Sequence, residues 1–250
     1  MCCLSAGCTL DPEATARGKT VGNVWAVEAI RELEGPPIVV DLYCRQGGAT
    51  KGFQNVGFRV IGVDIEPQPR YCGDGFIQAD AVQWVQDNHE WIRDNVALVA
   101  GSPPCQFYSA TQRIMQNDHP DLIGPTRNAL LDIGVPYVLE NVEDAAPYML
   151  APVRLCGESF GIHTYRHRMF EPGGWNLPEP GHKPHTAKTV KMGRPVTEGD
   201  YYHAVGNFVG VDYVRRDMGV PWMNREGIRE CIPPVYTQYI GERFRQAFQL

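Results

Sequence analysis

Several features common in other classes of protein are missing from this 250-residue sequence. It has no apolar run long enough to cross a bilayer, and residues 1–17 lack the basic start and apolar stretch of a secretory signal. Repeats and low-complexity tracts are also absent. We therefore expect a cytoplasmic protein with no membrane partner. Its 43% hydrophobic and 21% charged residues indicate a globular α/β protein with one sizeable core and at most a small appendage.

The sequence has no CxxC pair, although it contains eight cysteines. A disulfide scaffold would suit a short secreted chain, which this is not. A zinc site could in principle combine Cys2, Cys3 and Cys8 with the HxxH of His182 and His185, but no second correctly spaced pair accompanies them. We predict free thiols, surface imidazoles and no metal site.

The sequence also lacks an excess of positive charge. Its formal net charge of −6 argues against a protein that coats nucleic acid. Any contact with a polyanion must come from a local patch. Segment 166–194 is such a patch, with six basic residues against two acidic ones and a net charge of +4. On charge alone, a solvated loop that happens to be basic is the simpler interpretation.

Short apolar runs alternate with amphipathic segments along the chain. The runs predict buried strands at 38–40, 60–63, 76–78, 96–100 and 136–139, and the segments predict helices at 24–33, 50–56, 81–88, 120–133 and 236–248. This alternation indicates βαβ units and a mostly parallel sheet, which binds ligands beyond the carboxyl ends of its strands. Residues 1–19 look loosely ordered, and the change of composition at 172–212 predicts a small irregular lobe between 20–171 and 213–250.

A glycine-containing segment, 41–53, follows the first strand and opens a helix. Gly47 and Gly48 allow a tight turn and close approach to a ligand, and the helix start offers free N–H groups. Asp64 ends the second strand, where a carboxylate can accept hydrogen bonds from a ribose. Together they favour an adenosyl cofactor, although a structural turn is a fair competitor. Asp80 either accepts from an adenine amino group or caps a helix.

A thiol follows the strand at 96–100 rather than lying within it. In Gly101-Ser102-Pro103-Pro104-Cys105-Gln106 the two prolines fix the backbone and put Cys105 at the edge where ligands bind. A structural cysteine would more naturally lie inside the apolar run. Glu140 ends the next strand, in Leu139-Glu140-Asn141-Val142, and Arg166 and Arg168 share one side of an extended segment.

In this order, these strings resemble the C5-cytosine DNA methyltransferase family, above all its short bacterial and phage-type members. The likeness runs from Asp41 to about Arg168 and resumes from about Arg215 to Gly241. It implies a Rossmann-like class I methyltransferase domain in 20–171 and 213–250, and target recognition by the lobe at 172–212. It further implies S-adenosyl-L-methionine as methyl donor, S-adenosyl-L-homocysteine as product, double-stranded DNA with a flipped cytosine as substrate, and a possible cognate restriction endonuclease as partner, in a bacterial cell or phage-infected host.

The resemblance also implies roles for single residues. Cys105 would be the nucleophile, Glu140 would hold cytosine N3, Arg168 would contact the carbonyl oxygen of the base, and Arg166 would support that site. Cofactor contacts would come from the glycine turn, the ends of two strands and the prolines: Tyr43, Gly47, Gly48, Asp64, Ile65, Asp80 and Pro104. Substrate contacts would come from the loop after Cys105 and from the basic segment: Gln106, Ser109, Lys183, Lys188, Lys191 and Arg194.

Three positions depart from the family pattern. Arg45 replaces a glycine of the cofactor loop, Thr164 replaces a glutamine, and Arg229-Glu230-Cys231 replaces Gly-Asn and a small residue. Arg45 raises the idea of a donor with an extra carboxylate. Three alternatives stay open: an RNA cytosine-C5 methyltransferase, a catalytically silent nucleic-acid-binding homologue, and an amino-group methyltransferase. The last is disfavoured because it wants an aromatic residue where this chain has Cys105.

Overall fold

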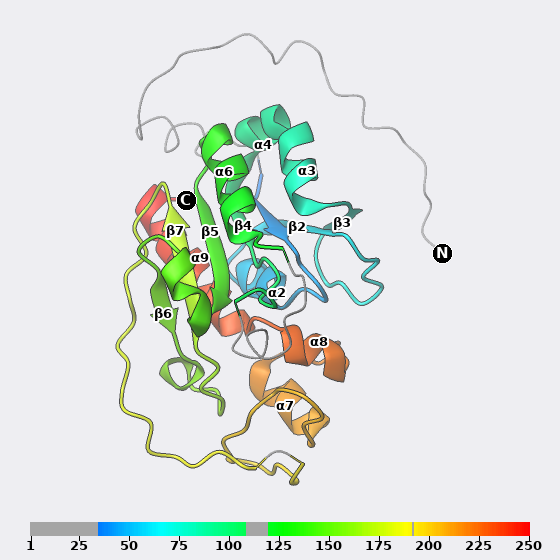
Figure 1. Ribbon diagram of the computed structural model, residues 1–250, viewed down its shortest axis with the longest axis vertical. Helices are drawn as coiled ribbons and strands as arrows, with labels where there is room; N and C mark the ends of the chain where they lie inside the picture. Colours follow the sequence, from blue (N-terminus) through cyan, green and yellow to red (C-terminus); the bar gives the residue numbers. More distant parts are fainter. Residues whose placement is uncertain (1–34, 109–119, 192) are drawn as a thin grey trace.

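The computed structural model describes residues 35–108, 120–191 and 193–250 (Figure 1). The helix expected at 24–33, the loosely ordered stretch 1–19 and Ser109 lie outside the described residues.

The described ranges contain one sheet of seven strands, in the order β3-β2-β1-β4-β5-β7-β6. The first five along the chain are parallel to one another, whereas β7 runs antiparallel to both β5 and β6. The predicted mostly parallel α/β sheet is therefore confirmed. The strands are β1 (Ile38–Leu42), β2 (Arg59–Asp64), β3 (Gly75–Gln78), β4 (Val96–Gly101), β5 (Tyr137–Val142), β6 (Val153–Leu155) and β7 (Arg168–Gly173).

Helices cover both faces of the sheet because successive strand residues point to opposite sides. Val39 belongs to a core shared with α2 (Gly48–Asn55) and α9 (Pro234–Phe248). Val40 faces the opposite core, shared with α3 (Ala81–Asp87), α4 (His89–Asn95) and α6 (Ile123–Ile133). Figure 1 shows these three helices together on one side of the sheet. Two 3-10 helices, η2 (Glu143–Tyr148) and η3 (Gly157–Phe160), flank β6.

A separate hydrophobic cluster lies below the sheet in Figure 1, around α7 (Val211–Met218) and α8 (Arg225–Glu230). Its buried members run from Tyr202 to Cys231, on both sides of the predicted lobe boundary at 212. Residues 174–210 form neither helix nor strand in the described part, apart from one isolated bridge between Thr189 and Tyr201. No described helix combines the length and apolar character needed to cross a membrane.

Candidate active site

The carboxyl ends of β1, β2, β4 and β5 meet at one edge of the sheet because these strands are parallel and in register. Leu42 pairs with Val63 on one side and Gly101 on the other, and Gly101 pairs with Leu139. This register brings together the residues that follow each strand. Sequence position alone predicted this edge, and the structure places the glycine turn, Asp64, Cys105 and Glu140 along it.

Cys105 lies in a loop that buried polar contacts hold in place. The Asn141 side-chain amide donates to the Pro103 carbonyl at 2.8 Å, and the Tyr108 N–H donates to the Cys105 carbonyl at 3.1 Å. Burial raises the pKa of the half-buried Cys105 thiol, Glu140 raises it further, and Arg168 opposes both. The resting thiol is therefore mostly protonated at neutral pH. Asn141 is a positioning residue that the sequence analysis did not single out, although it follows Glu140 directly.

β5 extends to Val142, beyond the predicted strand end at 139, so Glu140 is buried inside the strand, and Arg168 contacts it from the start of β7. Arg168 Nε lies 2.9 Å from Glu140 Oε1. Burial raises the pKa of Glu140, against the attraction of Arg168 and Arg166. Both Glu140 and Arg168 act on the pKa of Cys105, so the thiol, the carboxyl and the guanidinium form one electrostatic unit.

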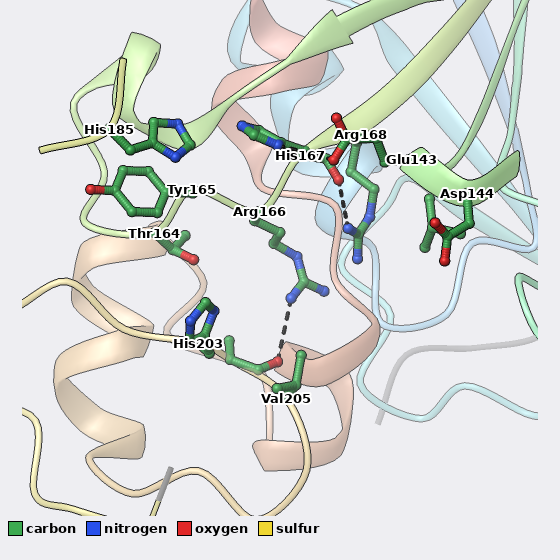
Figure 2. Close-up of a pocket in the computed structure, with 12 residues that line it drawn as sticks. Glu143, Asp144, Thr164, Tyr165, Arg166, His167, Arg168, His185, His203 and Val205 are labelled. Carbon is green, nitrogen blue, oxygen red and sulfur yellow. Dashed lines mark hydrogen bonds and ion pairs between the residues drawn. The ribbon is translucent and has the colours of Figure 1, made fainter. Parts of the chain in front are cut away.

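Arg166 binds the protein backbone with all three nitrogens of its guanidinium. Nε donates to the Cys231 carbonyl at 2.8 Å, Nη2 to Arg229 at 2.6 Å and Nη1 to Ala204 at 3.3 Å. Figure 2 shows the side chain reaching across the pocket to this last carbonyl. Burial lowers the pKa of Arg166 to about 10. Arg166 thus ties the start of β7 to the segment before α9, which fits its predicted supporting role.

A pocket of about 480 Å³ opens beside these arginines (Figure 2). Residues 164–168 form one wall and residues 203–205 form another. Its lining includes Arg168 but neither Cys105 nor Glu140, so Arg168 connects the pocket with the thiol and carboxyl. The pocket therefore lies between the sheet edge and the smaller cluster around α7 and α8.

Asp64 and Asp80 form different hydrogen bonds. Asp64 is buried, and its two carboxylate oxygens accept from the backbone N–H groups of Arg45 and Glu66 at 2.9 and 3.0 Å. Ile65 beside it is 65% exposed. Asp80 accepts from the Gln83 N–H at 2.9 Å and caps α3, which confirms the capping interpretation. A role for Asp80 at an adenine stays a prediction.

The glycine turn is packed by the chain itself. Gly47 has a φ of +85°, and a Cβ there would lie 2.7 Å from Cys72 Sγ. A Cβ at Gly48 would lie 2.5 Å from both Cys231 Sγ and the Ile232 carbonyl. The competing structural-turn interpretation is thus confirmed, while contacts of these glycines with a cofactor stay a prediction. The turn leaves the start of α2 without a side-chain cap. The other predicted contact here, Tyr43, shares a hydrogen bond of 2.8 Å with the Thr126 hydroxyl.

Arg45 and Glu230, which both depart from the pattern of the family that the sequence resembles, contact each other. The backbone of Arg45 has a φ of +47°, in the region that favours glycine. Its guanidinium pairs with Glu66 at 2.6 Å and, through Nε, with Glu230 at 2.6 Å. Because these two carboxylates already neutralise Arg45, the idea that it serves an extra carboxylate on the donor loses its support.

We expect Arg45 and Glu230 to be energetically coupled. The two side chains are 34% and 38% exposed, so the coupling should be small, about 0.5–1 kcal/mol. Urea unfolding of Arg45→Ala, Glu230→Ala and the double variant measures it. As a control, Arg93→Ala on α4 should be additive with Glu230→Ala. Additivity of the Arg45 and Glu230 variants would contradict the pairing.

Asp41 is predicted to make stability depend on pH. It is 1% exposed, accepts from the Thr50 hydroxyl at 2.6 Å, and burial raises its pKa to about 7. The folded state then holds a proton that the unfolded state loses near pH 4, so stability falls as pH rises from about 4 to 7, on the order of 1 kcal/mol per pH unit. Urea unfolding at pH 5 and pH 8 should show a smaller difference for Asp41→Asn than for the parent. The exposed Asp132→Asn should leave it unchanged, and an unchanged difference in Asp41→Asn would refute the prediction.

The remaining predicted residues lie on the surface. Lys183, Lys188, Lys191 and Arg194 are exposed on the coil after β7, and none forms an ion pair with a described residue. Pro104 and Gln106 are exposed on either side of Cys105.

The cysteines in the described ranges are free, as predicted. His182 is partly exposed and His185 is exposed, as expected of surface imidazoles, and the two lie together with Cys156 and His167. Neither Cys156 nor His167 belongs to a pair with metal-site spacing, so only their strand pairing could have revealed the group.

Comparison with known proteins gives a likeness in fold. No protein-family model matches the chain, and no curated protein sequence does. Among solved structures, the chain is similar to the Entamoeba histolytica methyltransferase EhMeth, with a TM-score of 0.55 and 10% identity over 85% of this chain and 99% of that one. At this identity the likeness shows the fold alone: the chain has the Rossmann-like α/β fold of a methyltransferase. The S. pombe Dnmt2 methyltransferase, at 17% identity over 55% of this chain and 49% of that one, has a TM-score of 0.38, too low to support an argument.

Proposed function

We propose that this protein is an S-adenosyl-L-methionine-dependent methyltransferase that methylates carbon 5 of cytosine in DNA. The observation that carries the proposal is the grouping of Cys105, Glu140 and Arg168 at the carboxyl edge of a sheet with a methyltransferase fold. A nucleophile, a buried carboxyl and a guanidinium are the groups needed to bond to a pyrimidine ring and hold its polar edge.

The chemistry assigned to these residues is covalent catalysis. Cys105 loses its proton, and the thiolate bonds to carbon 6 of cytosine, which breaks the aromaticity of the ring and makes carbon 5 nucleophilic. Glu140, in its protonated form, donates to N3 as negative charge develops there, and Arg168 donates to the carbonyl oxygen. The bound donor would supply the methyl group of its sulfonium to carbon 5, and the electron pair of the broken sulfur–methyl bond would stay with the departing thioether, S-adenosyl-L-homocysteine. The proton at carbon 5 then passes to a water molecule, the bond from carbon 6 to sulfur breaks, and the aromatic ring is restored.

The residues beyond β1 and β2 fit an adenosyl donor. Asp64 has its carboxylate fixed by two backbone N–H groups, and each oxygen keeps a further lone pair for a ribose hydroxyl. The exposed Ile65 side chain suits the apolar face of an adenine. The uncapped N–H groups at the start of α2 suit the donor's carboxylate.

A DNA substrate is supported by the basic segment. Its four exposed basic residues follow β7, whose first residue is Arg168. Such side chains can bind phosphates near the pocket, despite the net negative charge of the chain. Because a stacked cytosine cannot reach a thiol at a sheet edge, the base must be flipped, at a cost of a few kcal/mol.

Trapping on 5-fluorocytosine tests the proposal. Fluorine at carbon 5 cannot leave as a proton does, so the bond between Cys105 and carbon 6 should persist. The full chain is incubated with S-adenosyl-L-methionine and mixed-sequence duplex DNA containing 5-fluorocytosine, and adducts are detected on denaturing gels and mapped by mass spectrometry. We expect a donor-dependent adduct at Cys105. An adduct formed only with fluorinated RNA would identify an RNA methyltransferase, and binding without any adduct would identify a silent homologue; either result would overturn the proposal.

A further inference from the structure

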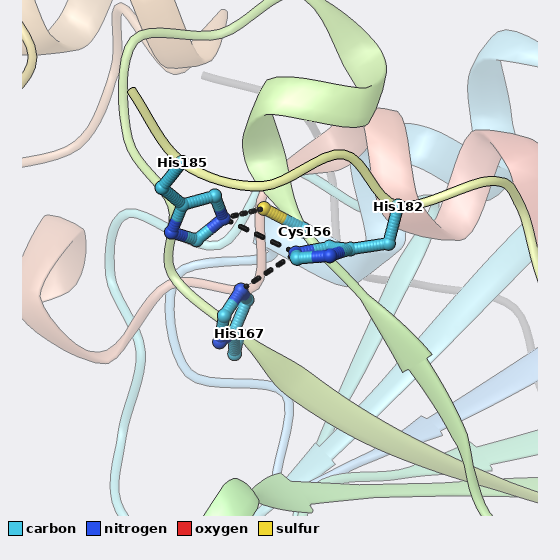
Figure 3. A group of neighbouring side chains, drawn as sticks. All are labelled: Cys156, His167, His182 and His185. Atoms are coloured by element: carbon cyan, nitrogen blue, oxygen red, sulfur yellow. Dashed lines mark hydrogen bonds between the residues drawn. The ribbon is translucent and has the colours of Figure 1, made fainter. Parts of the chain in front are cut away.

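Four side chains, two of which line the pocket, converge at one point (Figure 3). They are Cys156, His167, His182 and His185, and their ligand atoms all lie within 4.8 Å of one another. His182 Nε2 is 3.2 Å from His167 Nε2 and 3.1 Å from His185 Nε2, and Cys156 Sγ is 3.4 Å from His185 Nε2. Three imidazole nitrogens and a sulfur therefore point at a common centre.

The fold explains why residues so far apart in sequence meet here. β6 and β7 pair antiparallel, with Leu155 opposite Arg168. Cys156 and His167 are the next residues outward in the same register, so they face each other where the two strands end. The coil after β7 then passes this end and brings in His182 and His185.

Three of the six spacings between these ligand atoms are close to those of a tetrahedral zinc site, and the other three are within 4.8 Å. Zn–N distances of about 2.0–2.1 Å and a Zn–S distance of about 2.3 Å put neighbouring ligand atoms about 3.3–3.6 Å apart in a tetrahedron. The three close pairs here, at 3.1 to 3.4 Å, are near those values. Imidazole and thiolate are also the ligands that zinc prefers over calcium or magnesium.

Hydrogen bonds alone satisfy this group poorly. His182 Nε2 faces two other ring nitrogens, and one nitrogen carries either a single proton or a single lone pair. A metal ion accepts a lone pair from each nitrogen at once. On its far side, His167 Nδ1 lies 3.1 Å from Glu143 Oε2. A carboxylate that accepts the second N–H of a ligating histidine is the usual support of a zinc site.

We propose that Cys156, His167, His182 and His185 bind one Zn²⁺ ion, which anchors the coil after β7 to the ends of β6 and β7. The protein fills all four positions, so the site is structural and has no open position for a substrate. The coil needs such an anchor because residues 174–210 have no helix or strand and only one isolated bridge among the described residues. The ion fixes Lys183, between the two histidines of the HxxH, close to the pocket that His167 and His185 line. None of this depends on the proposed methyl transfer.

Metal analysis of the purified full-length chain tests the occupancy. Protein expressed in zinc-supplemented medium should retain about one zinc per chain after desalting. Cys156→Ser and His182→Ala should each lower that ratio at least several-fold. Cys72→Ser and His203→Ala, which change a thiol and a pocket imidazole outside the group, should keep it. A parent protein without zinc, or variants of the group that keep it fully, would overturn the proposal.

X-ray absorption on the zinc-loaded parent tests the ligands without relying on a variant that folds. We expect one sulfur at about 2.3 Å and three nitrogens at about 2.0–2.1 Å. Two or more sulfurs would point to other cysteines, such as Cys2, Cys3 and Cys8, and a shell without sulfur would exclude Cys156. Either result would refute the assignment. Cobalt exchanged for zinc should show a sulfur-to-metal charge-transfer band, which Cys72→Ser keeps and Cys156→Ser abolishes.

Discussion

Cys105→Ser is expected to lower methyl transfer by at least about 1,000-fold, because the covalent bond between the thiolate and carbon 6 can no longer form. A serine hydroxyl occupies nearly the same space at the half-buried position after Pro104 but is far less acidic than a thiol. The loop itself should persist, since the Asn141 and Tyr108 hydrogen bonds go to backbone carbonyls that the substitution keeps.

The measurement is transfer of radiolabelled methyl groups to mixed-sequence DNA, with DNA affinity determined in parallel. We expect unchanged affinity with lost transfer in Cys105→Ser, and full transfer in the control Asp132→Asn, an exposed position on α6. Serine at position 105 with parental activity would show that the sulfur does not bond to the base. Loss of both DNA affinity and cooperative unfolding in Cys105→Ser would instead indicate that this variant does not fold. Cys105→Ala would then be measured in its place.

Four of the five strands that the sequence predicted, β1, β2, β4 and β5, contain mostly buried runs of Val, Ile, Leu and Ala, which are easily recognised. The fifth, β3, was predicted from Phe76 and Ile77 although it is partly exposed. β7 was missed because it carries a charged residue in a buried place: Glu171 is fully buried and accepts two bonds of 2.6 Å from Arg127. From sequence alone, a carboxylate in a strand predicts an exposed position, because the distant arginine that pairs with it cannot be identified.

Some residues of the candidate site could likewise be predicted from the sequence, and others could not. Cys105 and Glu140 could be found because each follows a predicted strand, and parallel strands end at one edge. The pairing of Arg45 with Glu230 spans 185 positions and depends on how the segment before α9 returns to the glycine turn. The group around His182 depends on an antiparallel pairing that the sequence pattern did not reveal. Contacts of this kind are set by packing rather than by periodicity.

Glu140→Gln is expected to lower methyl transfer by about 100-fold or more, the usual contribution of a proton donor in the reacting complex. The amide fits the same space but cannot pass a proton to N3. The substitution also removes the carboxylate that Arg168 Nε contacts at 2.9 Å, so this partly exposed guanidinium loses its ion-pair partner. The exposed Glu90→Gln on α4 is the control and should keep the parental rate.

A second readout separates this chemical role from a collapsed site. Burial and the Glu140 carboxylate raise the pKa of the Cys105 thiol while Arg168 lowers it, so removing the carboxylate removes one of the influences that raise this pKa. Alkylation of Cys105 by iodoacetamide, followed by peptide mass spectrometry, should therefore reach half its maximal rate at a lower pH in Glu140→Gln than in the parent. The two effects have opposite signs: a thiol that is more easily ionised, in an enzyme that transfers fewer methyl groups. If Glu140→Gln left the alkylation profile of Cys105 unmoved, the carboxyl and the thiol would not share one electrostatic site, and the assignment of Glu140 to the reacting base would fail with it.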